Sequence, residues 1–123
     1  MDAFKLKQET AIEYYNTFTV LGSHVDGKLT LAENFADISG LQCVLSIAGD
    51  KASQKTALES YAHTWSTLIT DTAAKSILET DVHAPSNVRV NAVVACFDEF
   101  YEIYGVKEGD PMYIEPEKRV RRW

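Results

Sequence analysis

Two carboxylates lie four residues apart in a run that is otherwise apolar. Glu33 and Asp37 belong to the segment LAENFAD, residues 31–37. Positions i and i+4 share one face of a helix, and the apolar character continues to Ala48. We therefore expect a buried helix whose two carboxylates point into the interior or into a cleft. Buried carboxylates are costly unless they are paired, hydrogen-bonded or bound to a metal, so a cationic group or a metal ion should face them.

Simpler explanations fit the same two residues. A buried salt bridge or a helix-start carboxylate would account for them, and the spacing alone favours that interpretation because this pattern is common on helices. Thr30 is a suitable N-cap for the helix, and Glu33 stands where a capping box places its glutamate. This capping role competes directly with a metal-binding role for Glu33.

A second group of chemically capable residues is Asp81, His83 and Arg89. His83 precedes a predicted helix, where its ring can act as acid, base, ligand or hydrogen-bond donor to an oxyanion. Asp81 is close enough in sequence to orient that ring. Arg89 offers a rigid fork of donors suited to a carbonyl or a carboxylate. The alternative is a histidine at a helix start beside an ordinary Arg–Asp ion pair.

The remaining pattern predicts an all-α fold. Apolar residues recur at helical spacing and no strand pattern is convincing, so we expect one domain, residues 1–123, built as a helical bundle around a central buried helix. Gly49 should end the central helix, and Gly105 should end a later one. The other expected elements are helices over residues 2–19, 56–70, 85–95 and 97–104, a helical turn over 73–78, a loop over 22–28, a polar linker over 51–55 and a turn over 107–111.

Composition excludes several classes of partner. The 123 residues suffice for one domain or for part of a larger one, and the net charge of −6 argues against nucleic acid or an anionic membrane as a partner. No apolar run approaches the roughly 20 residues of a membrane span, and the first residues lack a signal-peptide pattern. Cys43 and Cys96 lie in apolar helical patterns and are expected to be buried free thiols of a reduced compartment, with a single disulfide as the alternative.

The two chemical segments resemble a known family. LAENFAD with SGL, residues 39–41, is similar to the E-N-x-A-D-x-x-G-L segment of neprilysin-type zinc metallopeptidases. TDVHAP, residues 80–85, and RVN, residues 89–91, resemble their T-D-x-H-S-P-x-x-x-R-V-x-G segment. The A-x-x-W pattern ending at Trp65, together with Gly105, residues 110–112 and the terminal Trp123, resembles further parts of the family in the same order. The resemblance extends over nearly the whole chain.

This resemblance implies a role for each candidate residue. Glu33 would be a zinc ligand, and Asp37 would accept a hydrogen bond from a zinc-bound histidine. His83 would stabilise the oxyanion of a tetrahedral intermediate, with Asp81 beside it, and Arg89 would hold a substrate backbone carbonyl. The implied reaction is attack of a zinc-activated water on a peptide bond of an oligopeptide, with a glutamate as general base.

The family's H-E-x-x-H helix, which carries two histidine ligands and the general base, has no counterpart among His24, His63 and His83. Catalytic zinc requires three protein ligands. The chain therefore looks like the C-terminal portion of a zincin catalytic domain, inactive alone, with a zinc site completed by the missing segment. It departs from the family also at Ala84, where a serine is usual, and at Asn91-Ala92, which displaces a glycine.

The resemblance also bears on location and partners. The disulfide cysteines of secreted and membrane-bound animal members are replaced by Val106 and Val120, which favours a bacterial, cytoplasmic, oligopeptidase-like member. The expected partners are an oligopeptide substrate and the remainder of the peptidase. Self-association of this chain through an uncovered apolar face is a further expectation. The alternative function is a non-catalytic helical module that binds a protein or a peptide.

Overall fold

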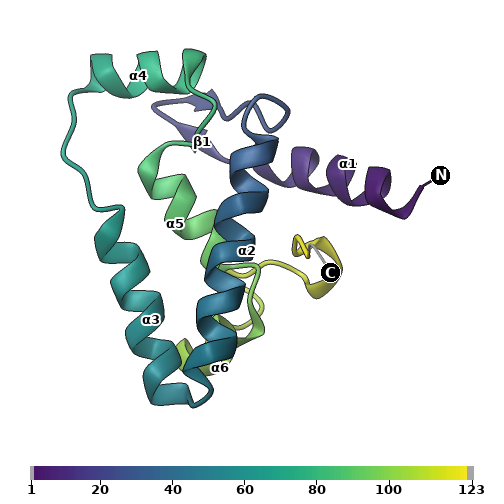
Figure 1. Cartoon of the computed structure of the whole chain (residues 1–123). Helices are drawn as coiled ribbons and strands as arrows, with labels where there is room; N and C mark the ends of the chain where they lie inside the picture. Colours follow the sequence, from purple (N-terminus) through teal and green to yellow (C-terminus); the bar gives the residue numbers. More distant parts are fainter. Residues whose placement is uncertain (1, 122–123) are drawn as a thin grey trace.

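The computed structural model describes residues 2–121, which form helices joined by short connections (Figure 1). The predicted all-α class is confirmed. The elements, in chain order, are α1 (Ala3–Asn16), β1 (Thr19–Val20), β2 (Ser23–His24), α2 (Leu31–Ala48), α3 (Lys51–Thr64), α4 (Asp71–Thr80), α5 (Ser86–Val94), α6 (Asp98–Tyr104) and the 3₁₀ turn η1 (Pro116–Lys118).

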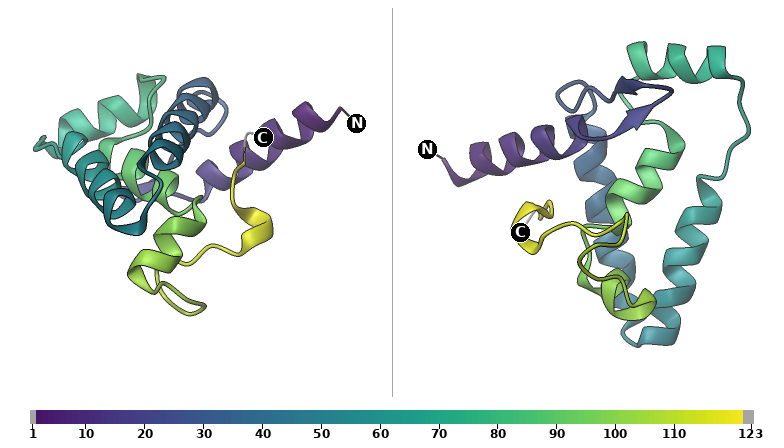
Figure 2. Two further views of the ribbon diagram at one scale, coloured as in Figure 1. Left: turned by 60° about the horizontal axis from the view of Figure 1, so that its bottom comes forward. Right: turned by 180° about the vertical axis from the view of Figure 1, so that it is seen from behind.

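Helix α2 is the central element, with the predicted bounds. It packs against α1, α3 and α5. Asn34, Ile38, Leu41 and Leu45 are buried along one face of the helix, at the spacing of three to four residues that a helix face requires. Gly49 ends the helix with φ of 73°, a backbone conformation that favours glycine. The chain then reverses, and α2 and α3 diverge with α5 between them (Figures 1 and 2).

Helix α3 begins and ends earlier than the sequence indicated. The segment 51–55, expected to be a linker, is its first turn, because Asp50 caps the helix by accepting hydrogen bonds from the backbone N–H and the hydroxyl of Ser53. The helix ends at Thr64 rather than near Thr70. Thr70 instead caps α4, which is longer than the expected turn over residues 73–78.

Helix α1 leads into a small hairpin. Thr19 pairs with His24 and Val20 pairs with Ser23, so the expectation of no strand is wrong for these two short strands. The loop after the hairpin passes close to α1: a Cβ on Gly27 would lie 2.3 Å from the Ile12 carbonyl oxygen, so only glycine fits there. The first turns of α1 project away from the other helices (Figure 2).

The core lies where α1, α2 and α5 meet. Its largest fully buried side chains are those of Tyr15, Ile38, Leu45, Val93 and Asn34. No helix within residues 2–121 is long and apolar enough to span a lipid bilayer. The terminal residue Trp123, which the sequence analysis singled out, lies outside the described residues.

Two expectations about α2 and the cysteines are wrong. Thr30 is the N-cap residue of α2, as predicted, but its side chain makes no capping bond to the helix, so Glu33 is not part of a capping box. The Thr30 hydroxyl instead donates to the Asp26 carbonyl and accepts from Asn34. Cys43 is exposed rather than buried, whereas Cys96 is a buried free thiol as predicted.

Helix α2 is also not buried all round. Its outer side carries a continuous row of exposed small or apolar residues, which we call the α2 stripe. The stripe consists of Ala32, Ala36, Gly40, Cys43, Val44 and Ile47.

Candidate active site

Glu33 and His83 meet at the surface between α2 and the segment before α5. The Glu33 Oε2 atom lies 3.2 Å from the His83 Nε2 atom, and both side chains are about two-fifths exposed. Glu33 stands on the first turn of α2, and Pro85 fixes an extended backbone between His83 and the start of α5. Glu33 is therefore accessible rather than buried, which suits a group that contacts a further ligand.

Asp81 holds the other side of the His83 ring. Its Oδ1 atom accepts the His83 backbone N–H at 2.8 Å and lies 2.7 Å from His83 Nδ1. The backbone hydrogen bond, and then the ring contact, lower the pKa of the Asp81 carboxyl below its ordinary value. A proton on Nδ1 directed at Asp81 leaves Nε2 facing Glu33 and solvent. Asp81 thus contacts both the backbone and the ring of His83.

Asp37 and Arg89 form a two-pronged ion pair deeper in the structure. Arg89 Nε and Nη2 donate to the two Asp37 oxygens at 2.8 and 2.7 Å, and the side chains are only 11% and 14% exposed. The hydrogen bond to Asp37 raises the pKa of the Arg89 guanidinium further above its ordinary value. Arg89 is therefore the cation that we expected to face Asp37. The partner of Arg89 is Asp37, and not Asp81, which is closer to it in the sequence.

Two aromatic residues of the α3 end complete the surroundings of Arg89. Its guanidinium carbon lies 3.6 Å from the centre of the Trp65 ring. The Tyr61 hydroxyl donates to the Arg89 backbone carbonyl at 3.0 Å. In the sequence, Tyr61 and Trp65 fall within the helix predicted over residues 56–70. The A-x-x-W pattern pointed to Trp65, and no pattern pointed to Tyr61.

A hollow of about 210 Å³ lies beside these residues. Its lining includes His83, Arg89 and Asp81 together with apolar side chains such as those of Ile69 and Ile77. A hollow that combines hydrogen-bond donors with apolar side chains can accommodate a peptide backbone together with an apolar side chain.

The donor atoms present fit one position of a zinc site. Zinc accepts carboxylate and imidazole ligands, and a catalytic site uses three protein ligands. Within residues 2–121 no three His, Cys, Asp or Glu residues are grouped so that they could hold a metal ion. Glu33 is accessible and suited to coordinate one, whereas His24 and His63 lie on exposed surfaces of other elements.

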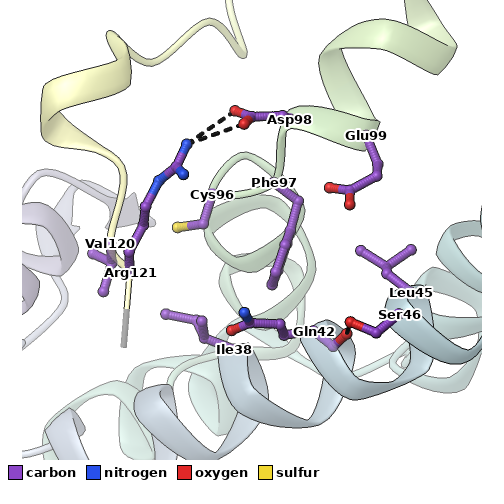
Figure 3. A pocket seen from close by; sticks show the side chains of 10 residues that line it. All are labelled: Ile38, Gln42, Leu45, Ser46, Cys96, Phe97, Asp98, Glu99, Val120 and Arg121. Carbon is purple, nitrogen blue, oxygen red and sulfur yellow. Dashed lines mark hydrogen bonds and ion pairs between the residues drawn. The ribbon is translucent and has the colours of Figure 1, made fainter. Parts of the chain in front are cut away.

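A separate hollow of about 180 Å³ lies between α2, the start of α6 and the C-terminal segment (Figure 3). Arg121 reaches across it to Asp98, and Cys96 and Phe97 point into it from the connection between α5 and α6. Burial raises the pKa of the Cys96 thiol to about 11. Since the thiolate is the reactive form, Cys96 is not suited to act as a nucleophile.

The helical fold and the pairing of an accessible Glu33 with His83 agree with the class that the motifs indicated, the metallopeptidases of the neprilysin type. The chain belongs to Peptidase family M13, whose family model matches residues 1–120.

Similar sequences come from lactic acid bacteria. A neutral endopeptidase of Lactobacillus helveticus is 38% identical over 100 residues, which cover 80% of this chain and 16% of that protein. A neutral endopeptidase of Lactococcus lactis subsp. lactis is 33% identical over 124 residues, which cover 99% of this chain and 20% of that protein.

Solved structures show the same arrangement. PepO from Lactobacillus rhamnosis has a TM-score of 0.89 at 33% identity, over 96% of this chain and 19% of that one. The zinc metalloprotease Zmp1 of Mycobacterium tuberculosis, solved with an inhibitor, has a TM-score of 0.86 at 29% identity, over 98% of this chain and 21% of that one. The chain therefore spans about a fifth of the length of these relatives.

Proposed function

We propose that this chain is the part of a longer zinc metalloendopeptidase that supplies one zinc ligand and the oxyanion and substrate contacts. Two contacts support the proposal: Glu33 with His83, and Asp37 with Arg89. They join two motifs that are about 50 residues apart in the sequence, and membership of Peptidase family M13 supports the same conclusion.

Each residue has a distinct task in the proposed reaction. Glu33 would coordinate the metal through its accessible carboxylate. Asp37 would accept a hydrogen bond from a metal-bound histidine of the segment outside this chain, while still holding Arg89. Zinc, when bound, would supply the activated water and polarise the peptide carbonyl.

With a proton on both ring nitrogens, His83 would donate from Nε2 to the oxygen on which negative charge develops, and Asp81 would keep the ring aimed at it by accepting from Nδ1. Arg89 uses Nε and Nη2 for Asp37, and within the described residues Nη1 makes no hydrogen bond. That nitrogen would donate to a backbone carbonyl of the peptide.

The substrate class we propose is oligopeptides, cleaved within the chain. The proposed location is the bacterial cytoplasm. The similarity to neutral endopeptidases of lactic acid bacteria and the two free cysteines support this location. A non-catalytic helical module that binds a protein or peptide is the second candidate, because the exposed α2 stripe offers such a binding surface.

The test compares this chain with a longer protein in which an H-E-x-x-H segment precedes it. The longer protein should bind zinc and cleave an internally quenched oligopeptide, and Glu33→Ala should abolish both. The 123-residue chain should cleave nothing. Cleavage by the isolated chain that Glu33→Ala abolishes, or full zinc binding by the longer Glu33→Ala variant, would overturn the proposal.

A further inference from the structure

Arg89 is held on three sides. The edge of the guanidinium is fixed by Asp37 from α2, through Nε and Nη2. One face of the guanidinium lies on the Trp65 ring, 3.6 Å from its centre. The backbone at Arg89 is fixed by the hydroxyl of Tyr61. The two hydrogen bonds to Asp37 fix the edge of the guanidinium but allow it to tilt about that edge. Among the described residues, Trp65 is the one that lies against its face and so restrains the tilt.

The contact with Trp65 is more than incidental core packing. Trp65 is the C-terminal capping residue of α3, where the chain leaves the helix. Its ring meets the Tyr61 ring edge to face, with centres 6.5 Å apart. Within residues 2–121 its buried Nε1 atom makes no hydrogen bond. The indole is thus oriented by two directional contacts, with the Tyr61 ring and with the Arg89 guanidinium. The contact with Arg89 is favourable because a cation is attracted to the face of an aromatic ring.

The position of Trp65 decides which part of Arg89 stays available. With one edge bound by Asp37 and one face covered by Trp65, the remaining donor nitrogen is Nη1. Arg89 also lines the hollow of about 210 Å³ that His83 lines. A guanidinium that could tilt would move Nη1 relative to His83 while keeping its bond to Asp37.

We propose that Trp65 is a positioning residue for Arg89, with Tyr61 in a supporting role: together they fix the tilt of the guanidinium so that Nη1 is aimed at the peptide carbonyl before substrate binds. The inference rests on the proposed function only in its last step, the carbonyl that Nη1 meets. The pre-organisation of Arg89 is a property of this chain by itself.

The first test uses the 123-residue chain and nuclear magnetic resonance. The Arg89 side-chain protons next to the guanidinium should be shifted upfield by the ring current of Trp65, and the Arg89 Nε–H proton should exchange slowly with water. Trp65→Leu should remove the upfield shift and broaden or average the Nε–H signal, whereas Trp65→Phe should retain part of both.

Arg119 is an internal control. It lies 3.7 Å from the centre of the Tyr101 ring and pairs with Asp98, so it has the same kind of surroundings outside the site. Its signals should be unchanged in both Trp65 variants, which shows that the fold is intact. Equal Arg89 signals in wild type and Trp65→Leu would overturn the inference.

The second test uses the longer peptidase. Trp65→Leu should raise KM roughly tenfold, the size of a cation–π contact at a partly covered site, with kcat changed little. Trp65→Phe should restore most of the affinity. In an Arg89→Ala background, Trp65→Leu should have no further effect on KM, because a positioning residue acts only through the residue that it positions.

The outcomes separate the two proposals. A further rise of KM in the Arg89→Ala background would show that Trp65 contacts substrate directly and would overturn the positioning role. A longer wild-type protein that cleaves no peptide would overturn the proposed function, while the magnetic resonance measurements would still decide whether Trp65 fixes Arg89.

Discussion

Arg89 donates to both carboxylate oxygens of Asp37, although 52 residues separate the two in the chain. The pair ties α5 to α2 at a point where both side chains are almost covered. Partly buried charges of this kind are costly to leave without their partner. The pair is therefore a structural element of this chain as well as a part of the candidate site.

The first prediction concerns the stability of the chain. Asp37→Ala or Arg89→Ala should each lower the free energy of unfolding by on the order of 3 kcal/mol, because each leaves a charge without its partner. The double variant should lose less than the sum of the two. Urea unfolding followed by circular dichroism measures all three.

The matched control is the ion pair of Lys55 and Glu59, which is exposed on α3. Lys55→Ala should leave the free energy of unfolding nearly unchanged, because an ion pair between exposed side chains contributes little. Additive losses in the Asp37 and Arg89 cycle would show that the two side chains contribute independently, contrary to the structure.

The second prediction distinguishes the roles of the site residues in the longer peptidase. Glu33→Ala should lose zinc, because it removes a ligand. Asp37→Ala should bind zinc about 10–100-fold more weakly, the usual effect of losing a partner of a ligand. His83→Ala should keep zinc and substrate affinity but lower kcat by about 10²–10³-fold, because its hydrogen bond strengthens only as the oxyanion forms. Arg89→Ala should mainly raise KM.

The measurements are zinc content, kcat and KM for the four variants side by side. If His83→Ala released the metal, or if Glu33→Ala kept it in full, these roles would be wrong. Because Arg89 also binds Asp37, zinc content must be measured for Arg89→Ala as well, and the prediction is that it stays near the wild-type value.

The sequence predicted α2 and the His83 segment well, for local reasons. The bounds of α2 follow from its apolar run and from Gly49, whose positive φ stops the helix. The contact of Asp81 with His83 spans two residues, so the spacing alone indicated it. The start of α3 was missed because its polar first turn resembles a linker until the capping bonds between Asp50 and Ser53 are known.

The long-range contacts could not be predicted from the chain alone. An arginine forms the same ion pair with any carboxylate that the fold brings near it, so the sequence could not choose Asp37 over Asp81 as the partner of Arg89. The stacking of Trp65 on Arg89 likewise depends on where α3 ends relative to α5. The family motifs named the residues, but the contacts among them come from the packing of α2, α3 and α5.

The third prediction concerns pH and Cys96. Burial raises the pKa of this thiol to about 11, whereas an unfolded cysteine ionises near 8.5–9. Between these values the unfolded chain loses the proton and the folded chain keeps it. The protonated thiol therefore stabilises the folded chain in full below about pH 8.5. This contribution is lost as the pH rises toward 11, by roughly 3 kcal/mol in all.

Urea unfolding across that pH range, for the wild type and for Cys96→Ala, measures this effect. The buried tyrosines also titrate in alkali, and Cys96 contributes to the raised pKa of Tyr14 and Tyr15. The difference between the two curves therefore measures Cys96 together with its coupling to these two tyrosines. The difference should change with pH only above about pH 8.5. A difference that is constant with pH would contradict the prediction. Under native conditions a thiol reagent should modify the exposed Cys43 quickly and Cys96 only on unfolding.

The last prediction concerns self-association through the α2 stripe. The stripe runs over about 22 Å of helix at 1.5 Å per residue, from Ala32 to Ile47, and contains no charged residue. Val44 and Ile47 are 48% and 86% exposed. A Cβ added to Gly40 would meet nothing within 4 Å, so another backbone can approach closely there. Exposed apolar surfaces of this kind are commonly covered by another chain.

We therefore expect the 123-residue chain to form dimers or larger species as its concentration rises, and to bind a hydrophobic dye. Sedimentation velocity should show a return to monomer for Ile47→Lys. The control is Leu68→Lys, which removes a fully exposed apolar residue outside the stripe and should leave association unchanged. Because Cys43 lies on the stripe, mild oxidation should link the associated chains through it, and Cys43→Ser should prevent this. A wild-type chain that remains monomeric at high concentration without dye binding would show that the stripe is not a self-association surface.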